Sequence, residues 1–540
     1  MQKLQKTWAI GLCLALLISL LAACSKTNNE AAGSDSGTEK PVTSDVKKEG
    51  FPIVGKPITL SMMAPDAGVQ KWDDMPVFKD LEKLTNIKLQ FRNAPMDSFA
   101  TKKNLVFASG DLPDIFYAAD LTPAEQVTYG AQGVLIPLEK LIDDYAPNLK
   151  KILDQHPELR KSITTNDGHI YALPYIDLSA VWYRGPMWYN GKFLKALNVK
   201  ALPETTEELF AYLKRVKDED PNGNGKPDEI PLTSVKLDDI RMFMLGFWGI
   251  YDEQIYADKD GKVHYTPQEE GYKGYLTFLN RLWTAGLLDK ETFSQTDDQK
   301  KAKGKNNQVA LFSDWFPYFT LGGEPDGSNP LMKPVKSEVP GSPVYGKHPG
   351  ISSNGTFAIT STNPDPEASM RWVDYLYGYD GATLFGQGPE NVLWKFKDKQ
   401  NHVKEWLPVP GGGDREEYRS TLTPNYGIVA PGISSSELAK GLRGDFDQWI
   451  DKETAEKLVP FAKPPYPHVF LTEAEQTEAS SLLSDLDTYV KQMEAKFVTG
   501  QEPLSNWDQY KSQIAKMGGE RIAEIYQAAY DRWNKSGSGQ

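Results

Sequence analysis

Cysteine is nearly absent from this sequence, which has only Cys13 and Cys24. Cys13 lies inside an apolar run over residues 10–21, which we expect to be removed from the mature chain. The remaining body then has no thiol that could form a disulfide, undergo oxidation or bind zinc. A chain of 540 residues without such cross-links relies on its hydrophobic cores, and it is long enough to build them.

Local catalytic motifs are also missing. The sequence has no G-x-S-x-G nucleophile turn, no phosphate-binding P-loop and no G-x-G-x-x-G after a predicted strand. The six histidines are too far apart for a local zinc motif: His156, His169, His264, His348, His402 and His468. A glycosidase needs only two carboxylates that folding brings together. The 73 Asp and Glu residues therefore leave a glycosidase or a polysaccharide lyase open as an alternative.

Clustered positive charge is the third absence. The formal net charge is −13, and the loss of Lys3 and Lys6 with the N-terminal segment lowers it to −15. Nucleic-acid-binding proteins carry basic stripes or patches that meet the phosphate backbone. The sequence therefore argues against a nucleic-acid partner and indicates an acidic, soluble exterior.

The first 23 residues are typical of a secretion signal. Lys3 and Lys6 precede the apolar run, which is shorter than a membrane-spanning helix. The run ends in Leu-Ala-Ala-Cys at 21–24, which resembles a bacterial lipobox. We therefore expect cleavage before Cys24 and a diacylglycerol on its thiol, which is a stable anchor. In the alternative, an ordinary signal, Cys24 is incidental.

Residues 24–55 are predicted to be a disordered tether. The stretch after Cys24 is rich in Ser, Asn, Gly and charged residues and contains almost nothing apolar, so it cannot bury a core. A linker of this composition lets a folded body move above a membrane. We expect an extracytoplasmic protein that is lipid-anchored at the cell membrane.

The body alternates strand and helix patterns from residue 58 onwards. Apolar and polar residues alternate over 58–62 and 87–91, as in strands, and 114–117 is predicted to be the next strand, while 77–84 and 99–108 are predicted to be helices. Strands that alternate with helices favour an α/β fold with a mostly parallel sheet. Ligands of such sheets bind beyond the carboxyl ends of the strands, so the turns there are candidate site loops.

The run Asp-Pro-Asn-Gly-Asn-Gly-Lys-Pro-Asp-Glu-Ile-Pro at 220–231 predicts a calcium loop. Calcium takes oxygen ligands, and Asp220, Asn222 and Asn224 stand at alternate positions. Gly225 permits the sharp turn that follows. The match to the EF-hand pattern fails at the twelfth position, which is Pro231. A solvated Asn-Gly turn is the alternative.

The flanks of this loop indicate a structural site. Leu209, Leu213 and Val216 have helical spacing upstream, and Thr205 with Glu208 forms a capping box that starts this helix. The residues at 230–232 look like the start of a strand. An ion in a loop between a helix and a strand fixes the turn between them, whereas a calcium sensor needs two helices that open.

The same run resembles the calcium loop of oligosaccharide-binding proteins of bacterial ABC importers, in the LplA/LipO-type and alginate-binding branch of solute-binding family 1. The resemblance implies a structural calcium ion whose ligands are Asp220, Asn222, Asn224, the carbonyl of Lys226, Asp228 and Glu229. Further phrases that resemble the family lie at 108–115, 135–138, 145–148, 167–174, 188–190, 363–375 and 500–507. Together they cover nearly all of the mature chain.

The resemblance implies an α/β, two-lobed periplasmic-binding-protein-like fold with an interlobe ligand cleft and a helical C-terminal region. We expect residues 56–178 and 352–400 in lobe I, and 179–351 and 401–540 in lobe II. It also implies a monomer that captures an oligosaccharide, does no covalent chemistry and delivers the sugar to the transmembrane subunits of an ABC permease. A peptide-binding lipoprotein is a further alternative.

Aromatic residues supply the candidates for ligand contact. A sugar ring presents a face of C–H groups that stacks on an aromatic ring, although most aromatic residues are core. Trp283 and Trp372 lie in apolar helical patterns and are predicted to pack inside. Trp248 and Trp315 are the best candidates for stacking. Further candidates are Asp314 as a hydroxyl acceptor and Tyr183, Arg184, Asn354, Trp394 and Trp72.

Overall fold

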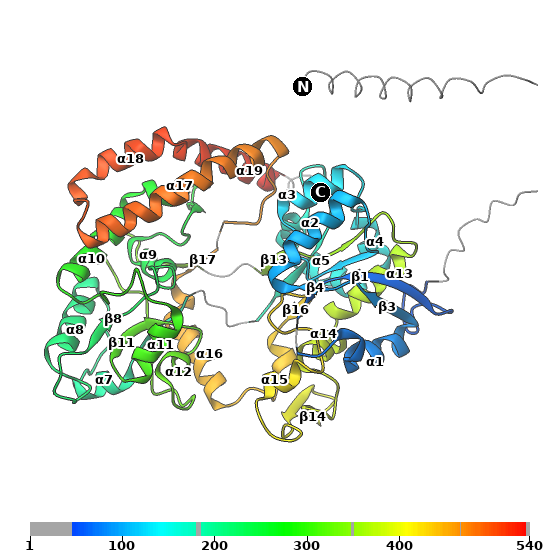
Figure 1. Cartoon of the computed structure of the whole chain (residues 1–540), viewed down its shortest axis with the longest axis horizontal. Helices are drawn as coiled ribbons and strands as arrows, with labels where there is room; N and C mark the ends of the chain where they lie inside the picture. The colour runs from blue at the N-terminus through cyan, green and yellow to red at the C-terminus, as the bar shows by residue number, and fades with distance from the viewer. Residues whose placement is uncertain (1–45, 68, 180–184, 347–349, 465, 536–540) are drawn as a thin grey trace, which may run out of the picture. The chain divides into compact units, whose positions relative to one another are not determined.

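A computed structural model describes residues 46–67, 69–179, 185–346, 350–464 and 466–535 (Figure 1). The predicted signal, Cys24 and most of the predicted tether lie outside these residues. Within the unit Ser44–Gln540, the buried side chains form two large hydrophobic clusters and one smaller cluster. We call the parts built around the two large clusters lobe I and lobe II.

Lobe I is organised by a six-stranded sheet with the order β16-β6-β13-β5-β1-β3. Its strands are β1 (Ile58–Met63), β3 (Ile87–Phe91), β5 (Ile115–Tyr117), β6 (Leu173–Asp177), β13 (Ile351–Ile359) and β16 (Gly432–Ser434). β1 is parallel to β3 and β5, β16 is parallel to β6, and β13 runs antiparallel to β5 and β6. The sheet is mixed, with parallel strands at both edges.

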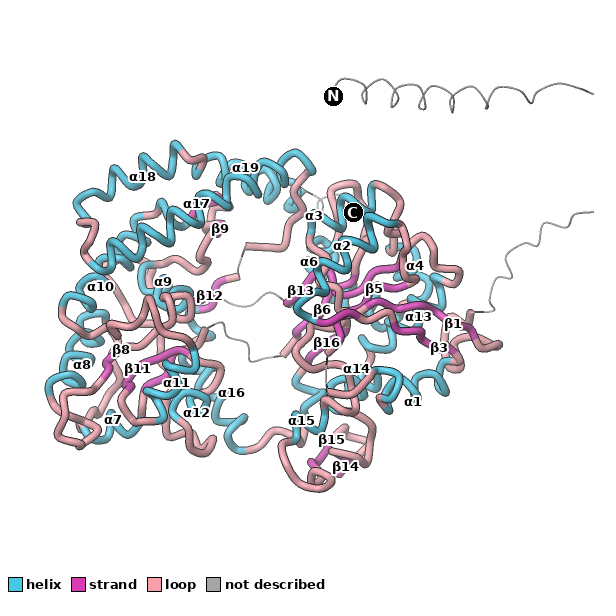
Figure 2. Tube along the Cα trace, viewed as in Figure 1, coloured by secondary structure: helices cyan, strands magenta, loops and turns pink. Residues whose placement is uncertain are grey.

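Helices cover both faces of this sheet, as Figure 2 shows. They are α1 (Pro76–Thr85), α2 (Phe99–Ser109), α3 (Pro123–Ala131), α4 (Glu139–Tyr145), α5 (Pro147–Gln155), α6 (Pro157–Ile163), α13 (Pro366–Asp374) and α14 (Tyr379–Gln387). Successive residues of β5 point to opposite faces, so Phe116 joins the small cluster while Ile115 and Tyr117 join the large one.

Lobe II contains a three-stranded sheet with the order β7-β11-β8. β8 (Ile230–Leu232) runs parallel to β11 (Val309–Ser313), and β7 (Met187–Tyr189) runs antiparallel to β11. The surrounding helices are α7 (Gly191–Ala196), α8 (Thr206–Asp218), α9 (Arg241–Leu245), α10 (Glu270–Thr284), α11 (Asp297–Lys305), α12 (Pro317–Leu321) and α16 (Asp445–Lys457). All five residues of β11 are buried, which makes this strand the centre of lobe II.

The C-terminal region is helical, as expected. It consists of α17 (Glu473–Thr499), α18 (Trp507–Lys516) and α19 (Gly519–Lys535), and α17 packs against α10. The remaining elements are β2 (Pro65–Asp66) with β4 (Ala94–Pro95), β9 (Ile255–Ala257) with β10 (Val263–Tyr265), β12 (Tyr345–Gly346) with β17 (Ala462–Lys463), β14 (Trp394–Asp398) with β15 (Val403–Trp406), and α15 (Arg415–Arg419).

The predicted elements at the start of the body agree with the structure to within a residue or two. The helix predicted at 77–84 is α1, which ends where Asn86 takes a left-handed conformation with φ 63°. The capping box of Thr205 and Glu208 is present at the start of α8. Trp372 is buried in α13, and the partly buried Trp283 packs against the core from α10.

Two predicted boundaries differ from the structure. β16 pairs with β6 of lobe I, so lobe I extends past residue 400, and the chain enters the lobe II core with Ile450 of α16. The tether was predicted to reach residue 55, but Ile53 and Val54 are fully buried in lobe I. The Arg371 side chain also donates to the carbonyls of Lys47 and Gly50, each at 3.1 Å.

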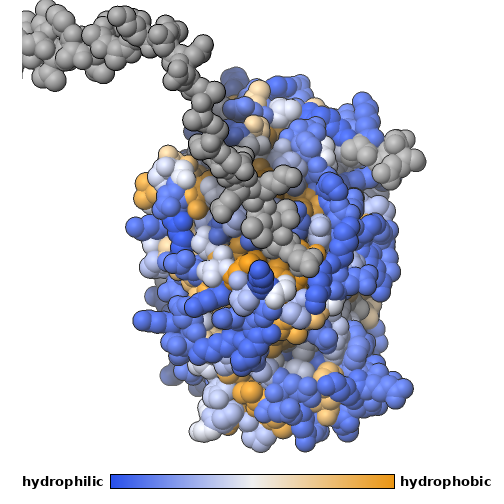
Figure 3. All heavy atoms as spheres, turned by 90° about the vertical axis from the view of Figure 1, so that its right-hand side faces the viewer, coloured by the Kyte–Doolittle hydropathy of each residue, from blue (hydrophilic) through white to orange (hydrophobic). Residues whose placement is uncertain are grey.

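The face seen in Figure 3 is mainly hydrophilic, with smaller hydrophobic areas between the charged side chains. This agrees with the acidic composition of the chain. No helix in the described part of the chain combines the length and the apolar character that a bilayer crossing requires.

Candidate functional site

The carboxyl ends of β8 and β11 form one edge of the lobe II sheet. Because the two strands are parallel, the residues after Leu232 and after Ser313 emerge side by side. Ligands of α/β sheets bind beyond such strand ends. The segments that follow are the loop 233–240, which leads into α9, and Asp314 with Trp315, which lead into α12.

Trp315 is held in an exposed position at this edge. Its side chain is 57% exposed. The backbone N–H of Trp315 donates to Asp314 Oδ1 at 2.8 Å, and the Thr320 hydroxyl donates to Asp314 Oδ2 at 2.8 Å. The indole N–H of Trp188 donates to the Asp314 carbonyl at 2.8 Å. The Asp314 carboxylate therefore fixes the turn that presents Trp315, and its side chain is only 8% exposed.

Further aromatic rings follow Trp315 in the chain and pack on one another and on α16. Phe319 of α12 is 41% exposed, and the ring centroids of Tyr318 and Phe319 lie 4.7 Å apart. The Phe316 ring lies 5.8 Å from Phe446 of α16, which stacks on Trp449 at 5.5 Å. We call these rings, with Trp315, the aromatic surface. Apart from Trp315, sequence reasoning missed it, because nothing at 446–449 indicates a contact with residues 315–319.

The loop 233–240 carries backbone strain. Lys236 and Leu237 both have positive φ, 54° and 65°, and a bulky residue rarely adopts this left-handed conformation. Leu237 is fully buried, and the Lys236 N–H donates to the Thr292 carbonyl at 2.7 Å. Such conformations persist only where the surroundings impose them, and they cluster at functional sites.

A buried lysine holds this loop to the end of β11. Lys300 Nζ lies 2.9 Å from Asp239 Oδ2 and 3.0 Å from the Ser313 carbonyl. The Ser234 hydroxyl donates to Asp239 Oδ1 at 2.5 Å. Burial acts to lower the pKa of Lys300, but Asp239 and Asp297 outweigh it, so the pKa lies above its usual value. The charges at this strand end are paired within the protein.

The loop at 220–229 winds around the carboxylate of Asp220. Asp220 Oδ1 accepts the N–H groups of Gly223 at 3.0 Å and Asn224 at 3.2 Å, and Oδ2 accepts the N–H of Gly225 at 2.9 Å. Gly225 has φ 72°, as expected for the sharp turn. The Lys226 carbonyl accepts the N–H of Asp228 at 3.0 Å. The predicted ligand oxygens thus share one small loop.

The remaining carboxylates of this loop converge as well. The Asn222 and Asn224 amides donate to Asp228 Oδ1, each at 3.0 Å, and hold the pKa of Asp228 below its usual value. Glu229 Oε1 is buried and has no hydrogen-bond partner among the described residues. Burial and then the neighbouring Asp220 carboxylate raise the pKa of Glu229. A cation between Asp220 and Glu229 would give the buried Glu229 oxygen a partner and would offset the repulsion between the two carboxylates.

These residues fit calcium better than a transition metal. Among the residues that the structure describes, no three or more His, Cys, Asp and Glu side chains gather as a metal site. The carboxylates of Asp220, Asp228 and Glu229 do not by themselves form such a group, but the loop adds amide and backbone oxygens, the donors that calcium prefers. β8 starts at Ile230, directly after Glu229, so the loop does connect a helix to a strand.

Trp248 lies in the lobe II core rather than at the strand ends. It is 4% exposed, and its ring lies 5.6 Å from that of Phe278. A Cβ added at Gly274 of α10 would collide with the indole, so this glycine makes room for it. A ring buried to this extent presents no face to a ligand in this structure.

Other predicted contact residues are also buried. Their side chains donate to backbone carbonyls: Trp72 to Ala67, Trp394 to Gly388 and Asn354 to Ser162, each at 2.9 Å. Tyr183 and Arg184 lie outside the described residues. Of the predicted ligand-contact residues, Trp315 and Asp314 are the two that lie at the carboxyl end of a strand, directly after β11.

Comparison with known proteins gives a consistent family. Residues 66–383 match the family described as "Bacterial extracellular solute-binding protein". The fructooligosaccharide ABC transporter substrate-binding protein FusA of Streptococcus pneumoniae is 28% identical over 96% of both chains. Polygalacturonan/rhamnogalacturonan-binding protein YtcQ of Bacillus subtilis is 23% identical and covers 97% of this chain and 98% of its own. Lipoprotein LipO of Bacillus subtilis is 26% identical over 73% of this chain and 75% of its own.

Solved structures agree. FusA in complex with kestose is 27% identical, with a TM-score of 0.72 over 89% of this chain and all of that chain. A second FusA structure is of an EF-hand mutant, so that relative carries an EF-hand. The alginate-binding protein AlgQ2, at 24% identity and a TM-score of 0.67 over 89% of this chain and all of its own, supports the fold alone. The mixed α/β periplasmic-binding-protein fold expected from the sequence is confirmed.

Proposed function

Because this chain belongs to the family of bacterial extracellular solute-binding proteins, we propose that it captures an oligosaccharide outside the cell and delivers it to the permease of an ABC transporter. Members of this family are binding components of transporters, and the chain is therefore not an enzyme. Its task is to recognise a solute and to change conformation when the solute is bound.

The aromatic surface carries this proposal. Trp315 and Phe319 are exposed residues that follow the carboxyl end of β11, where a sugar ring can stack its C–H face on an aromatic ring. Relatives bind sugars according to their names, as FusA does with fructooligosaccharides and YtcQ with polygalacturonan and rhamnogalacturonan. Asp314 orients Trp315 for this contact, and the strained loop 233–240 lies at the same sheet edge.

Transport requires two conformations of the protein. A sugar bound to lobe II favours closure of the lobes if it makes additional contacts with lobe I in the closed state, because a ligand shifts an equilibrium only by its differential affinity. The permease then distinguishes loaded from empty protein by shape. We propose that the working unit is a monomer.

We further propose one structural calcium ion in the loop 220–229. The unpartnered Glu229 oxygen, its contact with the Asp220 carboxylate and the EF-hand of the relative FusA support this site. The ligands are Asp220, Asn222, Asn224, the Lys226 carbonyl, Asp228 and Glu229. Gln308, which precedes β11, also donates to Asp228 Oδ2 at 3.1 Å. The ion thus stabilises the start of both parallel strands.

Retention at the cell surface is proposed to come from a lipid on Cys24. The Leu-Ala-Ala-Cys motif and the relative named lipoprotein LipO support this. Fractionation of cells that express Cys24→Ala tests it: the variant is expected in the soluble extracellular fraction. Its retention in membranes, with the intact mass confirmed, would contradict the anchor.

A binding screen tests the main proposal. Mature protein is titrated with neutral fructan and plant-wall oligosaccharides, with uronate oligomers and with a peptide library, using thermal shift and then calorimetry. We expect a sugar to raise the melting temperature and the peptides to have no effect. Peptides that co-purify in native mass spectrometry would instead support the peptide-binding alternative. New reducing ends after incubation would support a glycosidase.

A further inference from the structure

The dipeptide Asn-Gly occurs four times in this chain, at 190–191, 222–223, 224–225 and 354–355. In this pair the backbone nitrogen of glycine can attack the side-chain amide of asparagine, because glycine has no side chain that hinders the approach. The product is a deamidated residue. The sequence therefore contains four chemically equivalent candidates for this modification, and the structure places them in two different environments.

Two of the pairs are buried. Asn190 is 1% exposed, and the N–H of the following Gly191 donates to Asn329 Oδ1 at 3.0 Å. Asn354 of β13 is 9% exposed, and its amide donates to the Ser162 carbonyl at 2.9 Å. A close-packed interior leaves such an amide little room to turn toward the next nitrogen. These two pairs are therefore expected to be inert.

The other two pairs follow one another in the loop 220–229 and face water. Asn224 and both glycines are exposed, while Asn222 is partly exposed. Gly223 and Gly225 have φ 71° and 72°, and apart from the chain neighbours no atom lies within 4 Å of the position of an added Cβ. Neither burial nor packing protects these pairs, so their protection depends on hydrogen bonds within the loop.

The attacking nitrogens of both exposed pairs are bound to one carboxylate. Asp220 Oδ1 accepts the N–H of Gly223 at 3.0 Å, and Oδ2 accepts the N–H of Gly225 at 2.9 Å. A nitrogen in such a bond must first leave the carboxylate, and hydrogen bonds to charged groups are among the stronger ones. The nearby negative charge also opposes loss of the proton during the attack. Asp220 therefore holds back both nucleophiles.

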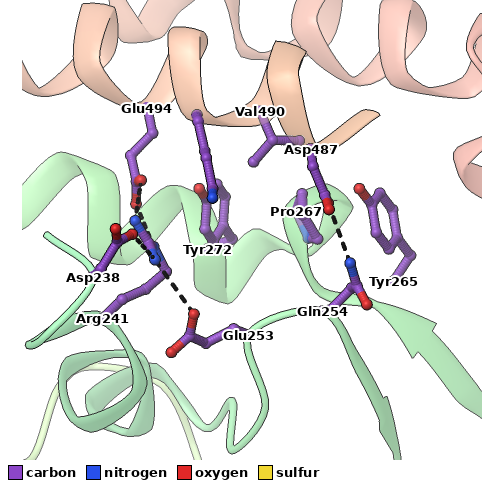
Figure 4. A pocket seen from close by; sticks show the side chains of 11 residues that line it. Asp238, Arg241, Glu253, Gln254, Tyr265, Pro267, Tyr272, Asp487, Val490 and Glu494 are labelled. Atoms are coloured by element: carbon purple, nitrogen blue, oxygen red, sulfur yellow. Dashed lines mark hydrogen bonds and ion pairs between the residues drawn. The ribbon is translucent and has the colours of Figure 1, made fainter. Parts of the chain in front are cut away.

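Other carboxylates of lobe II bind cationic side chains instead. In Figure 4, the Arg241 guanidinium binds Glu494 of α17 through hydrogen bonds of 3.0 and 2.7 Å and Asp238 Oδ1 at 2.8 Å. In the part of the chain that the structure describes, no Lys, Arg or His side chain forms an ion pair with Asp220. Its two oxygens are therefore available to the backbone N–H groups of the loop.

The amide groups that would leave are held as well. The Nδ2 atoms of Asn222 and Asn224 each donate to Asp228 Oδ1 at 3.0 Å. Their Oδ1 atoms accept the backbone N–H groups of Asn224 at 3.0 Å and Lys226 at 2.8 Å, respectively. Each amide is fixed at both ends, so its carbon turns toward the glycine nitrogen only when the loop opens locally. Local opening and the hold of Asp220 together set the rate.

We propose that Asn222 and Asn224 are sites of spontaneous deamidation and that Asp220 restrains this reaction by binding the nitrogens of the glycines that follow them. The glycine nitrogen forms a bond to the Asn Cγ and gives its proton to water, the Cγ–Nδ2 bond breaks, and Nδ2 takes up a proton and leaves as ammonia. Water then opens the cyclic succinimide to aspartate or isoaspartate. The net reaction consumes one water and releases one ammonia. This inference goes beyond the proposed function and does not depend on the identity of the solute.

Deamidation changes the charge of the loop. Each event replaces an amide that donates to Asp228 by a carboxylate, which has no hydrogen to donate and carries the same charge as Asp228. Like charges at hydrogen-bonding distance repel, so the modified loop depends more strongly on a cation. Isoaspartate also lengthens the backbone, which disturbs the turn around Asp220.

The first test removes the restraint. Mature wild type and Asp220→Ala are incubated in EDTA, so that bound metal plays no part, and peptide mass spectrometry follows deamidation at each Asn-Gly pair. The rate at Asn222 and Asn224 is expected to rise roughly tenfold in Asp220→Ala, since each attacking nitrogen loses a bond to a charged group. Asp326→Ala is the matched control, because Asp326 also accepts a backbone N–H in a turn, that of Ser328 at 2.9 Å. It should leave both rates unchanged.

A second variant guards against a general loss of structure. Asp220→Asn keeps the shape of the side chain and one acceptor oxygen, and its new amide precedes Pro221, whose nitrogen carries no hydrogen and cannot attack. An intermediate rate is expected. Asn190 and Asn354 report folding in the same samples, because they stay unmodified as long as their surroundings remain packed.

Faster deamidation at Asn222 and Asn224 in both Asp220 variants, with Asn190 and Asn354 unchanged, supports the proposal. If a folded Asp220→Ala deamidates no faster than the wild type, the restraint by Asp220 is wrong. If the wild type deamidates equally at all four pairs, the assignment to the exposed loop is wrong. If Asp220→Ala unfolds, the comparison of Asp220→Asn with the wild type decides in the same way.

Discussion

Acidic residues lie at both ends of β8, but in the described part of the chain only those at the carboxyl end are paired with cationic side chains of the protein. At the amino end, Asp220, Asp228 and Glu229 lie together, and among the described residues none of them forms an ion pair with a Lys, Arg or His side chain. At the carboxyl end, Asp239 is paired with the buried Lys300. One end is where we propose a cation from solution, whereas the carboxylate of Asp239 at the other end is paired within the chain.

This difference shows which end of β8 would make the stability of lobe II depend on the calcium concentration. A charge pair supplied by the protein is present at any ion concentration. An ion bound from solution stabilises the fold in proportion to the logarithm of its concentration. Perturbing each end separately therefore sharpens the comparison, and the expected effects can be ranked.

The largest effect is expected at the internally paired end. Arg241→Ala leaves Glu494, which is 3% exposed, without its bidentate partner. Breaking a buried pair from one side costs about 3–5 kcal/mol. Urea unfolding of the mature chain should show this loss with and without calcium. Arg521→Ala, which removes an exposed pair with Glu478, is the control and should change stability by less than about 1 kcal/mol.

Removal of calcium is expected to come next. At a calcium concentration about 100 times the dissociation constant, chelation should cost about 2.7 kcal/mol. EDTA should lower the melting temperature without abolishing sugar binding. Asp220→Ala should remove the response to EDTA, while Asp326→Ala, in another hydrogen-bonded turn, should retain it. Equal melting of wild type and Asp220→Ala in both conditions would rule out the ion.

Truncation of the exposed tryptophan should affect binding alone. Trp315→Ala is expected to lose about 2 kcal/mol of binding free energy, roughly a thirtyfold loss in affinity, with unchanged melting. Trp248→Ala should instead destabilise the fold by about 3–5 kcal/mol, because its ring fills the core. Calorimetry and thermal melting separate the two. Unaltered affinity of a well-folded Trp315→Ala would exclude stacking on this ring.

The smallest effect is expected from relief of strain. Lys236 is exposed and has φ 54°, a conformation that Asn adopts more readily. Lys236→Asn should therefore stabilise the protein by about 0.5–1 kcal/mol. Lys290→Asn, also exposed but without positive φ, is the control. A loss of stability at Lys236 would show that its side chain, and not the backbone, dominates this position.

The conformation of the loop 220–229 could be predicted because its residues are neighbours in the sequence, while the calcium ion itself stays a prediction. Every predicted ligand lies within 220–229, and the conformation depends on local hydrogen bonds to Asp220. The first strands and helices were predictable for the same reason, since periodicity over a few residues reports which face is buried. The predicted end of the tether was wrong because two apolar residues, Ile53 and Val54, are enough to pack this segment into lobe I.

The aromatic surface could not be predicted in the same way. It unites residues 315–319 with Phe446 and Trp449, and no local pattern connects them. Trp248 and Trp315 look alike in sequence, each beside Phe and near a turn. Their exposure differs because Gly274, on a distant helix, opens a space for one indole, while Asp314 turns the other outward. β16 was missed because three residues are too few to show alternation.

The exposure of Trp315 also has an optical consequence. Among the tryptophans that the structure describes, Trp315 alone is exposed, whereas Trp72, Trp188, Trp248, Trp372, Trp394 and Trp507 are buried. Its emission is therefore the one most open to collisions with a dissolved quencher such as acrylamide. A sugar that covers the ring shields it from those collisions. Quenching of the unlabelled protein with and without sugar therefore tests whether a ligand covers Trp315 at the proposed strand-end site.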